Sequence, residues 1–481
     1  MKRRNFTHIL SLLGSVSLLT ILASCNPLIE EEKPGPENPI EEETKETEPF
    51  LESGIFKDSD YLKVYGSQVK TVGEDGNGDK VVNLKGTNAG GYLLIERWMT
   101  AFDNPQDRDK YLSADETIED WPQKGTVDHR TLTRIFTERF GKEGCLEIWE
   151  AYRNNFWTDL DFIYCADMGM NCIRLPFSYM NVDPLYNNVE EIQGYEFNFE
   201  LLDNFIEGAA EHGIYTILDL HGAYGSQNGQ DHSGDQRQND EDIDFYLDTP
   251  EGREKREKTI HLWGELTKRY KGNPAVAAFD ILNEPGEHAR STTKVHWDFF
   301  DEVYKEIREI DEDRIVMFES CWDGVNLPHP TNSEHGYNWQ NCIYSFHNYT
   351  NAGSNSDAHI QSMENKINGV HNQGFGVPCN MGEFTGYGYK ANWTLTLELF
   401  NKSGWSWNSW TYKINRDNDW AYSGWGFYFT RATRVVPDVD SLDEIIEKFE
   451  GLKTTASTTQ EMRFSDNSTL SSVVKIYTTT N

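Results

Sequence analysis

Two glutamates stand at the ends of apolar runs in this sequence. The stretch 280–286, DILNEPG, begins in such a run and carries Asn283 and Glu284 near its end. Glu383 closes a second run, GVPCNMGEF, at 376–384. Two carboxyl groups, one protonated and one ionised, can perform general acid–base and nucleophilic catalysis together. The alternative is that both glutamates are polar residues in ordinary strand exits.

The pattern of the chain predicts a scaffold that would bring the two glutamates together. Apolar, strand-like runs alternate with amphipathic helical segments, and several of the helical segments end in glycine. Eight strands separated by helices favour a parallel (β/α)8 barrel, with residues 442–453 as the closing helix. The candidate strands are residues 82–86, 171–176, 214–221, 275–284, 314–320, 341–349, 376–384 and 404–413.

Catalytic groups of such a barrel lie at the C-terminal ends of its strands. Polar and aromatic side chains gather at most of the candidate strand ends, and they are Arg174, His221, Asn283, Glu284, His347, Tyr349, Glu383 and Trp410. Each has a structural alternative, such as an ion pair for the arginine, core positions for the histidines and the tryptophan, or a helix cap for Glu383. All of these alternatives would have to hold together for the barrel rim to carry no function.

These residues and the barrel together resemble glycoside hydrolase family 5, whose signature is Asn-Glu on the fourth strand and Glu on the seventh. The resemblance covers roughly residues 60–450. A narrower likeness points to the exo-β-1,3-glucanase branch of that family. The stretches that carry it, besides LNEP, are LKGTNAGGYLLIERWMT (84–100), NCIRLPFSY (171–179), DLHGAYGSQNGQDHSG (219–234) and WTYK (410–413).

The resemblance implies a role for each residue at the strand ends. Glu284 would be the acid/base and Glu383 the nucleophile of a retaining hydrolase, which forms a covalent glycosyl-enzyme. Arg174 and Tyr349 would keep Glu383 ionised, since a nearby cation or donor favours the charged carboxylate. Asn283 would bind the sugar 2-hydroxyl. The other three would orient hydroxyls or carboxylates, or form the floor under the sugar ring: His221, His347 and Trp410.

Glu96, in LIERWM, matches a glutamate that contacts the terminal sugar in the exo-glucanase branch, and its alternative is a surface glutamate beside a strand. Trp98, Tyr224 and Trp322 are either platforms for outer sugars or packing residues. The chain departs from the branch pattern, with AGGY for LGGW, AYGSQNG for APGSQNG, and an apparent insertion at 107–130. We therefore expect exo action on β-1,3-glucan but leave endo action and β-1,4 or β-1,6 linkages open.

Two further functions remain open beside a β-glucanase or β-glucosidase. A transglycosylase would use the same residues with a different acceptor, and a non-catalytic glycan-binding lipoprotein would have a decayed barrel. A barrel that has lost its activity usually lacks one of the two catalytic carboxylates, whereas Glu284 and Glu383 are both present here. The sequence has no GxSxG motif of serine hydrolases and no HExxH or CxxC motif of metal-dependent ones. Nothing in it demands a metal or an organic cofactor.

The N-terminal region predicts export and a lipid anchor. Residues 1–24 have a basic start and a short apolar core, too short for a stable membrane span. The ending LASC resembles the lipobox of bacterial lipoproteins, in which Cys25 is lipidated, and a plain secretory signal is the alternative. Residues 25–54 are rich in Glu and Pro, which favours a disordered tether. We expect a lipoprotein of the cell envelope, in the outer membrane and exposed on the cell surface.

Composition limits the partners and the remaining features. The 481 residues carry a net charge of −35, so nucleic acid and anionic lipid surfaces would repel the protein, and a neutral or cationic partner is favoured. The resemblance implies that this partner is a β-glucan. Residues 60–85 are predicted to form a hairpin. Its DGNGD turn (75–79) has the spacing of calcium-loop oxygens, but Lys80 and Gly86 stand where such a loop needs a glycine and a glutamate, so a plain turn is favoured over a metal site. Residues 454–481 would be a Ser/Thr-rich tail or a peripheral strand after the catalytic domain, 55–453. We expect the cysteines other than Cys25 to be small core residues with free thiols, and disulfides between them are the alternative.

Overall fold

The structure is a computed structural model of the chain. It describes residues 49–112, 126–183, 197–236, 243–286, 293–321, 324–332, 334–350, 352–415 and 424–479. The expected signal peptide (1–24), the lipidation candidate Cys25, most of the tether (25–54) and Trp322 lie outside these residues. The same is true of residues 113–125 within the expected insertion.

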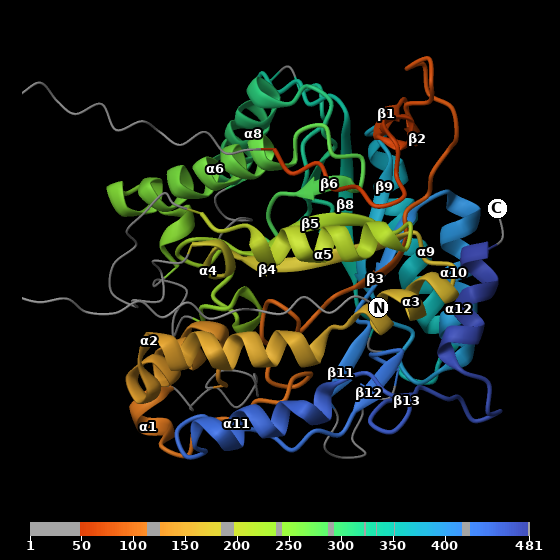
Figure 1. Ribbon diagram of the computed structural model, residues 1–481. Helices are drawn as coiled ribbons and strands as arrows, with labels where there is room; N and C mark the ends of the chain where they lie inside the picture. The colour runs from red at the N-terminus through yellow and green to blue at the C-terminus, as the bar shows by residue number, and fades with distance from the viewer. Residues whose placement is uncertain are drawn as a thin grey trace, which may run out of the picture. The chain divides into compact units, whose positions relative to one another are not determined.

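Eight parallel strands close into a barrel in the order β10-β3-β4-β5-β6-β7-β8-β9, so the first and last strands of the barrel are neighbours. Figure 1 labels β3, β4, β5, β6, β8 and β9 of this barrel. This confirms the predicted (β/α)8 fold. The strands are β3 (Lys85–Asn88), β4 (Cys172–Ser178), β5 (Tyr215–Gly222), β6 (Val276–Asp280), β7 (Val316–Glu319), β8 (Cys342–Asn348), β9 (Cys379–Phe384) and β10 (Ser406–Ser409).

Helices follow the strands and have the end signals that the sequence suggests. Thr249 caps α6 by accepting from the Gly252 N–H, and α9 and α10 end at glycines in the left-handed region, Gly374 and Gly404. The longer helices are α2 (His129–Phe156), α3 (Asp159–Asp167), α5 (Glu200–Glu211), α6 (Pro250–Tyr270), α8 (Thr293–Ile310), α9 (Ser356–Gln373) and α10 (Lys390–Ser403). Short helices α1 (Arg108–Tyr111) and α4 (Tyr179–Val182) lie in loops.

The strand predicted at 275–284 is too long. The parallel ladder of β6 ends at Asp280, although the Ile281 N–H still donates to the Met317 carbonyl and the Asn283 N–H to the Leu220 carbonyl. Glu284 has a φ of 41°, which lies in the left-handed region and takes the chain out of the sheet. Ile281 and Leu282 are fully buried, which explains why their apolar character suggested a strand.

An N-terminal hairpin covers the end of the barrel at which its strands begin. Strands β1 (Leu62–Tyr65) and β2 (Gln68–Thr71) pair antiparallel, so a hairpin is present, but its turn lies at residues 66–67 and not at 75–79 as predicted. The turn at 75–79 follows β2 and is flanked by a single antiparallel bridge between Lys70 and Val81. The buried side chains Leu62 and Val69 of the hairpin join a core cluster with residues from the beginnings of the barrel strands, such as Ile217, Ala277 and Ile343. The burial of this end leaves the C-terminal rim as the place for a site.

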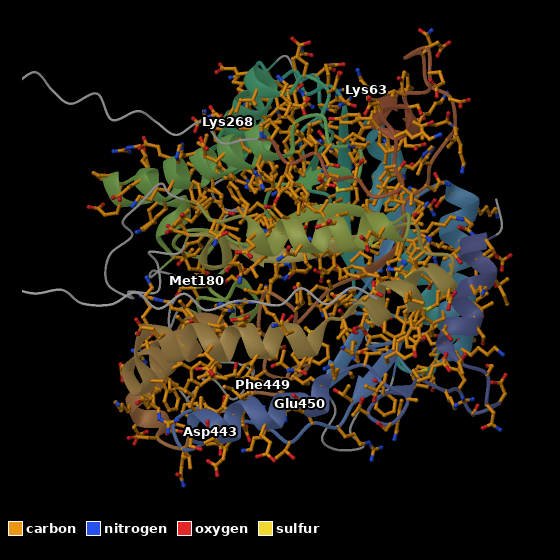
Figure 2. The ribbon with its side chains drawn as sticks, in the orientation of Figure 1. Lys63, Met180, Lys268, Asp443, Phe449 and Glu450 are labelled. Atoms are coloured by element: carbon orange, nitrogen blue, oxygen red, sulfur yellow. The ribbon has the colours of Figure 1, made fainter. Side chains whose placement is uncertain are left out.

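A second core lies between α2 and the helix α11 (Leu442–Phe449). Phe449 is fully buried and its ring lies 5.6 Å from that of Phe102 and 5.3 Å from that of Tyr152. Asp443 and Glu450, labelled with Phe449 in Figure 2, are exposed. The alternation of buried and exposed positions along α11 is the pattern of an amphipathic helix that packs on one side.

The segment after residue 453 holds both a strand and a helix. Strand β13 (Gln460–Glu461) pairs with β12 (Tyr428–Thr430), which pairs with β11 (Lys413–Asn415). Helix α12 (Leu470–Thr479) packs against α10, and the Tyr477 carbonyl accepts from Lys85 of β3. The sequence did not lead us to expect this helix, since its serines, threonines and valines favour strands or loops.

Two further observations concern the described residues alone. Their six cysteines are free thiols, five of them buried and Cys379 partly so. Across the same ranges, no helix has the combined length and apolarity that crossing a bilayer would require.

Candidate active site

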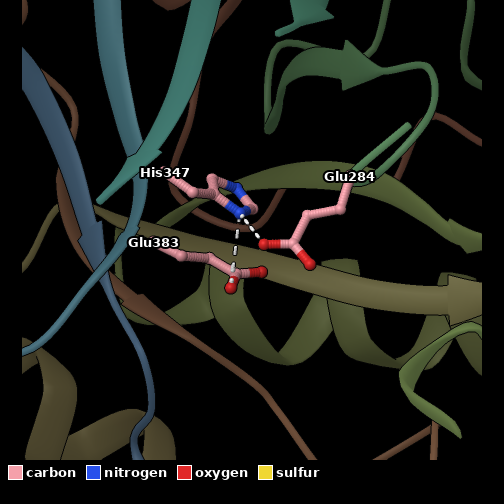
Figure 3. A group of neighbouring side chains, drawn as sticks. All are labelled: Glu284, His347 and Glu383. Atoms are coloured by element: carbon pink, nitrogen blue, oxygen red, sulfur yellow. Dashed lines mark hydrogen bonds and ion pairs between the residues drawn. The ribbon is translucent and has the colours of Figure 1, made fainter. Parts of the chain in front are cut away.

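Glu284 and Glu383 meet at the C-terminal rim of the barrel, with His347 between them (Figure 3). One carboxylate oxygen of each glutamate and a ring nitrogen of His347 all lie within 4.8 Å of one another. His347 Nδ1 is 2.8 Å from Glu284 Oε1 and 3.4 Å from Glu383 Oε2. His347 of β8 and Glu383 of β9 are partners in the strand register, which places their side chains side by side.

Glu383 is held on both carboxylate oxygens. Arg174 Nη1 donates to Oε1 at 3.0 Å, and the Tyr349 hydroxyl donates to Oε2 at 2.7 Å. Burial raises the pKa of Glu383, whereas His347 and the Arg174 guanidinium oppose this rise. Burial and Glu383 together raise the pKa of Tyr349 well above its usual value, so this hydroxyl stays protonated and acts as a donor.

The sequence suggested that Arg174 lies at the end of its strand. It lies instead inside β4, and its side chain is fully buried. Besides Glu383, its guanidinium contacts Asp280 at 2.9 Å, Asp219 at 3.1 Å and Glu319 at 3.3 Å. Burial raises the pKa values of Asp219 and Asp280 to about 7, and the carboxylates keep Arg174 charged. One cation thus stands among four acids.

Asn283 and His221 form the next part of the same network. Arg174 Nη2 donates to Asn283 Oδ1 at 2.9 Å, so the amide NH2 of Asn283 faces His221 Nε2 at 3.2 Å. His221 Nδ1 in turn lies 2.7 Å from Asp219 Oδ2. Burial lowers the pKa of His221 to about 4, which favours its neutral form. The structure therefore brings together every residue that the strand-end argument selected on β4, β5 and β6.

The loop after β5 supports the backbone at Asn283 and Glu284. Gln227 Nε2 donates to the carbonyl of His221 at 2.8 Å and to that of Asn283 at 2.9 Å. Asn228 Nδ2 donates to the Glu284 carbonyl at 3.2 Å. Through these contacts the SQNG stretch (226–229) holds in place the backbone that follows β6.

Trp410 and Glu96 also lie at this rim. The Trp410 ring stacks on His221, with ring centroids 5.4 Å apart and an angle of 12° between the planes. Glu96 accepts from Trp98 Nε1 at 2.7 Å, and burial, Asp231, Glu383 and Glu284 raise its pKa well above the usual value. Glu96 is therefore not a free surface glutamate, because it lies within the electrostatic field of the site.

The aromatic candidates differ in their surroundings. Tyr224 is buried against Tyr179, with ring centroids 4.1 Å apart, and is therefore a packing residue. Trp98 is half-buried and lies 5.3 Å from Trp425, which also contacts Tyr349 at 5.4 Å. Trp425 is a rim residue that sequence reasoning missed, since no motif marks it.

Two other residues of the site were missed. Glu319 ends β7, accepts the Glu284 N–H at 3.0 Å, and lies 3.2 Å from His347 Nε2. The strand-end rule that selected Glu383 would also have selected Glu319, which closes the run predicted at 314–320. His232 Nε2 lies 3.2 Å from Glu284 Oε2 and comes from the loop after β5, where no strand end points to it.

Glu284, His347 and Glu383 could in geometric respects hold a metal ion. The neighbouring charges argue against a resident cation, because the Arg174 guanidinium lies 3.0 Å from Glu383 and would repel it. His347 already contacts both carboxylates. We therefore assign this cluster to carboxylate chemistry.

The fold and the site define a (β/α)8-barrel protein with two facing glutamates at the C-terminal rim, the arrangement of retaining glycosidases. The family model described as cellulase (glycosyl hydrolase family 5) matches residues 140–425, more than half of the chain. The chain belongs to glycosyl hydrolase family 5.

Its curated relatives are distant. A beta-xylosidase of Phanerodontia chrysosporium is 29% identical over 292 residues, covering 60% of this chain and 52% of that protein. A probable glucan 1,3-beta-glucosidase A of Neosartorya fischeri is 28% identical over 250 residues, covering 50% and 52% respectively. The chain thus spans about half the length of these relatives. A solved rutinosidase from Aspergillus niger shares the fold, with a TM-score of 0.52 at 17% identity over 72% of this chain and 95% of that one.

Proposed function

We propose that this protein is a retaining glycoside hydrolase that cleaves β-glucosidic bonds, with exo action on β-1,3-glucan as the first choice. The observation that carries this proposal is the approach of the Glu284 and Glu383 carboxylates within 4.8 Å. Retaining enzymes hold their two carboxyl groups about 5–5.5 Å apart, whereas inverting enzymes need about 6.5–9.5 Å to admit a water molecule. The separation here favours direct attack on the sugar.

The surroundings of the two glutamates support different roles for them. Glu383 receives hydrogen bonds from Arg174 and Tyr349, which favour the ionised state that a nucleophile needs. Glu284 would protonate the leaving oxygen while Glu383 attacks the anomeric carbon. Water would then cleave the glycosyl-enzyme, with Glu284 accepting its proton.

The linkage rests on weaker support. The relatives named glucan 1,3-beta-glucosidase favour β-1,3-glucan, and Glu96 near the catalytic pair would suit recognition of a terminal sugar. The relative named beta-xylosidase makes a terminal xylose the second candidate. Linkages of the β-1,4 and β-1,6 types remain candidates, as does transglycosylation, which would use the same residues. A purely glycan-binding role is disfavoured by the complete carboxylate pair.

Two variants test the proposed mechanism. Glu383→Ala should lower the cleavage of 2,4-dinitrophenyl β-glucoside on the order of 10⁴-fold or more. Glu284→Ala should be slow but should recover with azide, which replaces water and gives a β-glucosyl azide. Glu147→Ala, at an exposed position on α2, is the matched control. Wild-type rates in Glu383→Ala would rule out the mechanism.

A product profile then decides between the substrates. Laminarin, cellulose, mixed-linkage glucan, pustulan and an aryl β-xyloside would be compared under one condition. Release of glucose alone from laminarin supports an exo-acting β-1,3-glucanase, whereas a ladder of oligosaccharides contradicts exo action.

We also propose that the protein is a cell-envelope lipoprotein, anchored through Cys25, in the outer membrane and facing outward. The support is the lipobox-like LASC and the acidic stretch that follows it. The anchor would be its only attachment to a membrane, and a surface enzyme would meet polysaccharide directly.

A further inference from the structure

Glu284 has a strained backbone conformation at a point where the sheet no longer holds the chain. The ladder of β6 ends at Asp280, and the next residue, Ile281, still donates its N–H to the Met317 carbonyl of β7. Three residues later, Glu284 has a φ of 41°, in the left-handed region that a residue with a β-carbon occupies only at a cost in free energy. A glycine would avoid that cost but would remove the carboxyl group. Contacts from other segments must therefore hold this conformation.

Side chains from two other segments hold the Glu284 backbone on both sides. Its N–H donates to Glu319 Oε1, at the end of β7, at 3.0 Å. Its carbonyl accepts from Asn228 Nδ2, in the loop after β5, at 3.2 Å. His347 Nε2 also lies 3.2 Å from Glu319 Oε1, but these two atoms make no hydrogen bond. The Glu284 N–H is therefore the group whose hydrogen bond Oε1 accepts.

The other carboxyl oxygen of Glu319 accepts from Arg174. The distance from Arg174 Nη2 to Glu319 Oε2 is 3.3 Å. The same guanidinium donates through Nη1 to Glu383 Oε1 at 3.0 Å. Three hydrogen bonds thus connect the Glu383 carboxylate to the Glu284 backbone, and they pass through Arg174 and Glu319. This bridge links the two proposed catalytic glutamates by side chains, without the main-chain ladder.

The bridge is rigid because its two side chains are buried and Arg174 has used all of its donors. Both side chains are fully buried, so water cannot replace their partners. A guanidinium is planar and has five N–H donors. The five hydrogen bonds of Arg174 go to Asn88, Asp280, Asn283, Glu319 and Glu383. The position of Glu319 is therefore tied to that of the nucleophile.

We propose that Glu319 is a positioning residue that holds Glu284 at the distance and angle from Glu383 that the reaction requires. The inference rests on the proposed function, in which Glu284 reaches the leaving oxygen while Glu383 attacks the anomeric carbon. Such geometry is demanding, because a displacement on the order of 1 Å can cost about 100-fold in rate. Glu319 would act through the Glu284 backbone and would exchange no proton itself.

An alternative role for Glu319 is to balance the charge of Arg174, and two substitutions separate the roles. Glu319→Gln keeps the length of the side chain, but its amide offers one acceptor and one donor group where two donors must be met. Glu319→Asp keeps both acceptor oxygens and the acidic group, but it is one methylene shorter and cannot reach both partners. Positioning requires both features, whereas charge balance requires only the acid.

Each variant would be assayed on two aryl β-glucosides. Phenyl β-glucoside has a leaving group that must be protonated by Glu284, whereas the leaving group of 2,4-dinitrophenyl β-glucoside needs no proton. The value of kcat/KM on each substrate reports the step in which Glu383 attacks. Glu312→Gln, at an exposed position shortly before β7, is the matched control. Circular dichroism and thermal melting would check that the variants fold.

We expect kcat/KM on phenyl β-glucoside to fall about 10- to 100-fold in both Glu319→Gln and Glu319→Asp. On the dinitrophenyl substrate both variants should stay within about threefold of the wild type, because the hydrogen bonds to Glu383 itself are unchanged. The control should match the wild type on both substrates. If Glu319→Gln does not fold, Glu319→Asp still decides, since it keeps a carboxyl group in the buried cluster.

The outcomes separate this inference from the proposed function. Equal losses on both substrates would assign Glu319 a structural role and overturn the inference. Wild-type values of kcat/KM for Glu319→Asp would leave charge balance as its role and would overturn it as well. A wild-type protein that cleaves neither glucoside would instead overturn the proposed β-glucosidase activity, and the inference with it.

Discussion

Arg174 connects the surroundings of Glu284 and Glu383 in the candidate site. Its guanidinium touches Glu383 directly and orients Asn283, the residue before Glu284. The same guanidinium also contacts the carboxyl groups of Asp219, Asp280 and Glu319, so its single positive charge is shared with these three acids. Burial raises the pKa values of these three acids, while the Arg174 guanidinium opposes the rise in each of them.

The Tyr349 hydroxyl offers a test of how Glu383 stays ionised. Removing it in Tyr349→Phe loses a 2.7 Å hydrogen bond to Oε2, which stabilises the charged form only. A hydrogen bond to a charged group contributes about 1.5–3 kcal/mol, so kcat/KM should fall about 10- to 150-fold. The pKa of Glu383 should rise further, and the acid limb of the pH profile should move to higher pH.

The sign of that shift follows from the role of the group. Activity requires ionised Glu383 and is lost as the pH falls through its pKa, so a higher pKa moves the loss upward. Tyr387→Phe, in the neighbouring aromatic cluster around Trp425, is the control. An unchanged acid limb in Tyr349→Phe would show that Arg174 and His347 suffice to keep the nucleophile charged.

At the level of elements, the barrel was predictable because its strands are buried on both sides. Continuous apolar runs such as 214–221 and 341–349 correspond closely to β5 and β8. The rule that places catalytic groups at strand ends predicts that Glu284 and Glu383 lie close together, and in the structure they do. The roles of the individual residues beyond their placement stay predictions.

Other features were not predictable, because they depend on contacts between distant segments. His232 contacts Asn228 of its own loop and Glu284, which follows β6, and nothing in the stretch DHSG predicts these contacts. Helix α12 was missed since LSSVVKIYTT has weak helix propensity. Its helical form depends on packing, with Leu470 and Val474 fully buried.

Helix α12 should therefore contribute to global stability. Leu470→Ala removes a fully buried side chain from the main core cluster and should lower the free energy of unfolding by about 2–5 kcal/mol. Ile476→Ala changes a side chain of the same helix that is 58% exposed, and should stay within about 0.5 kcal/mol of the wild type. Urea denaturation measures both. Equal stability of the two variants would mean that α12 is a dispensable tail.

The whole chain is strongly acidic. A net charge of −35 opposes electrostatic binding to anionic lipid and to nucleic acid, and a covalent lipid would not depend on such binding. The expected tether is acidic too, which would keep the catalytic domain away from an anionic bilayer surface. A lipid on Cys25 fits both requirements, since it needs no contact between the barrel and the membrane.

The anchor can be tested in cells that make the full chain. Wild-type protein should incorporate labelled palmitate, sediment with the outer membrane and be digested by proteinase K added to intact cells. Cys25→Ser should lose the label and appear in the soluble fraction, because one deleted thioether removes all of the acyl chains at once. Cys379→Ser, at a partly buried thiol, should behave like the wild type. Unlabelled wild-type protein would leave a plain secretory signal as the better interpretation of LASC, and labelled protein that resists proteinase K would place the catalytic domain inside the envelope, away from large polysaccharides.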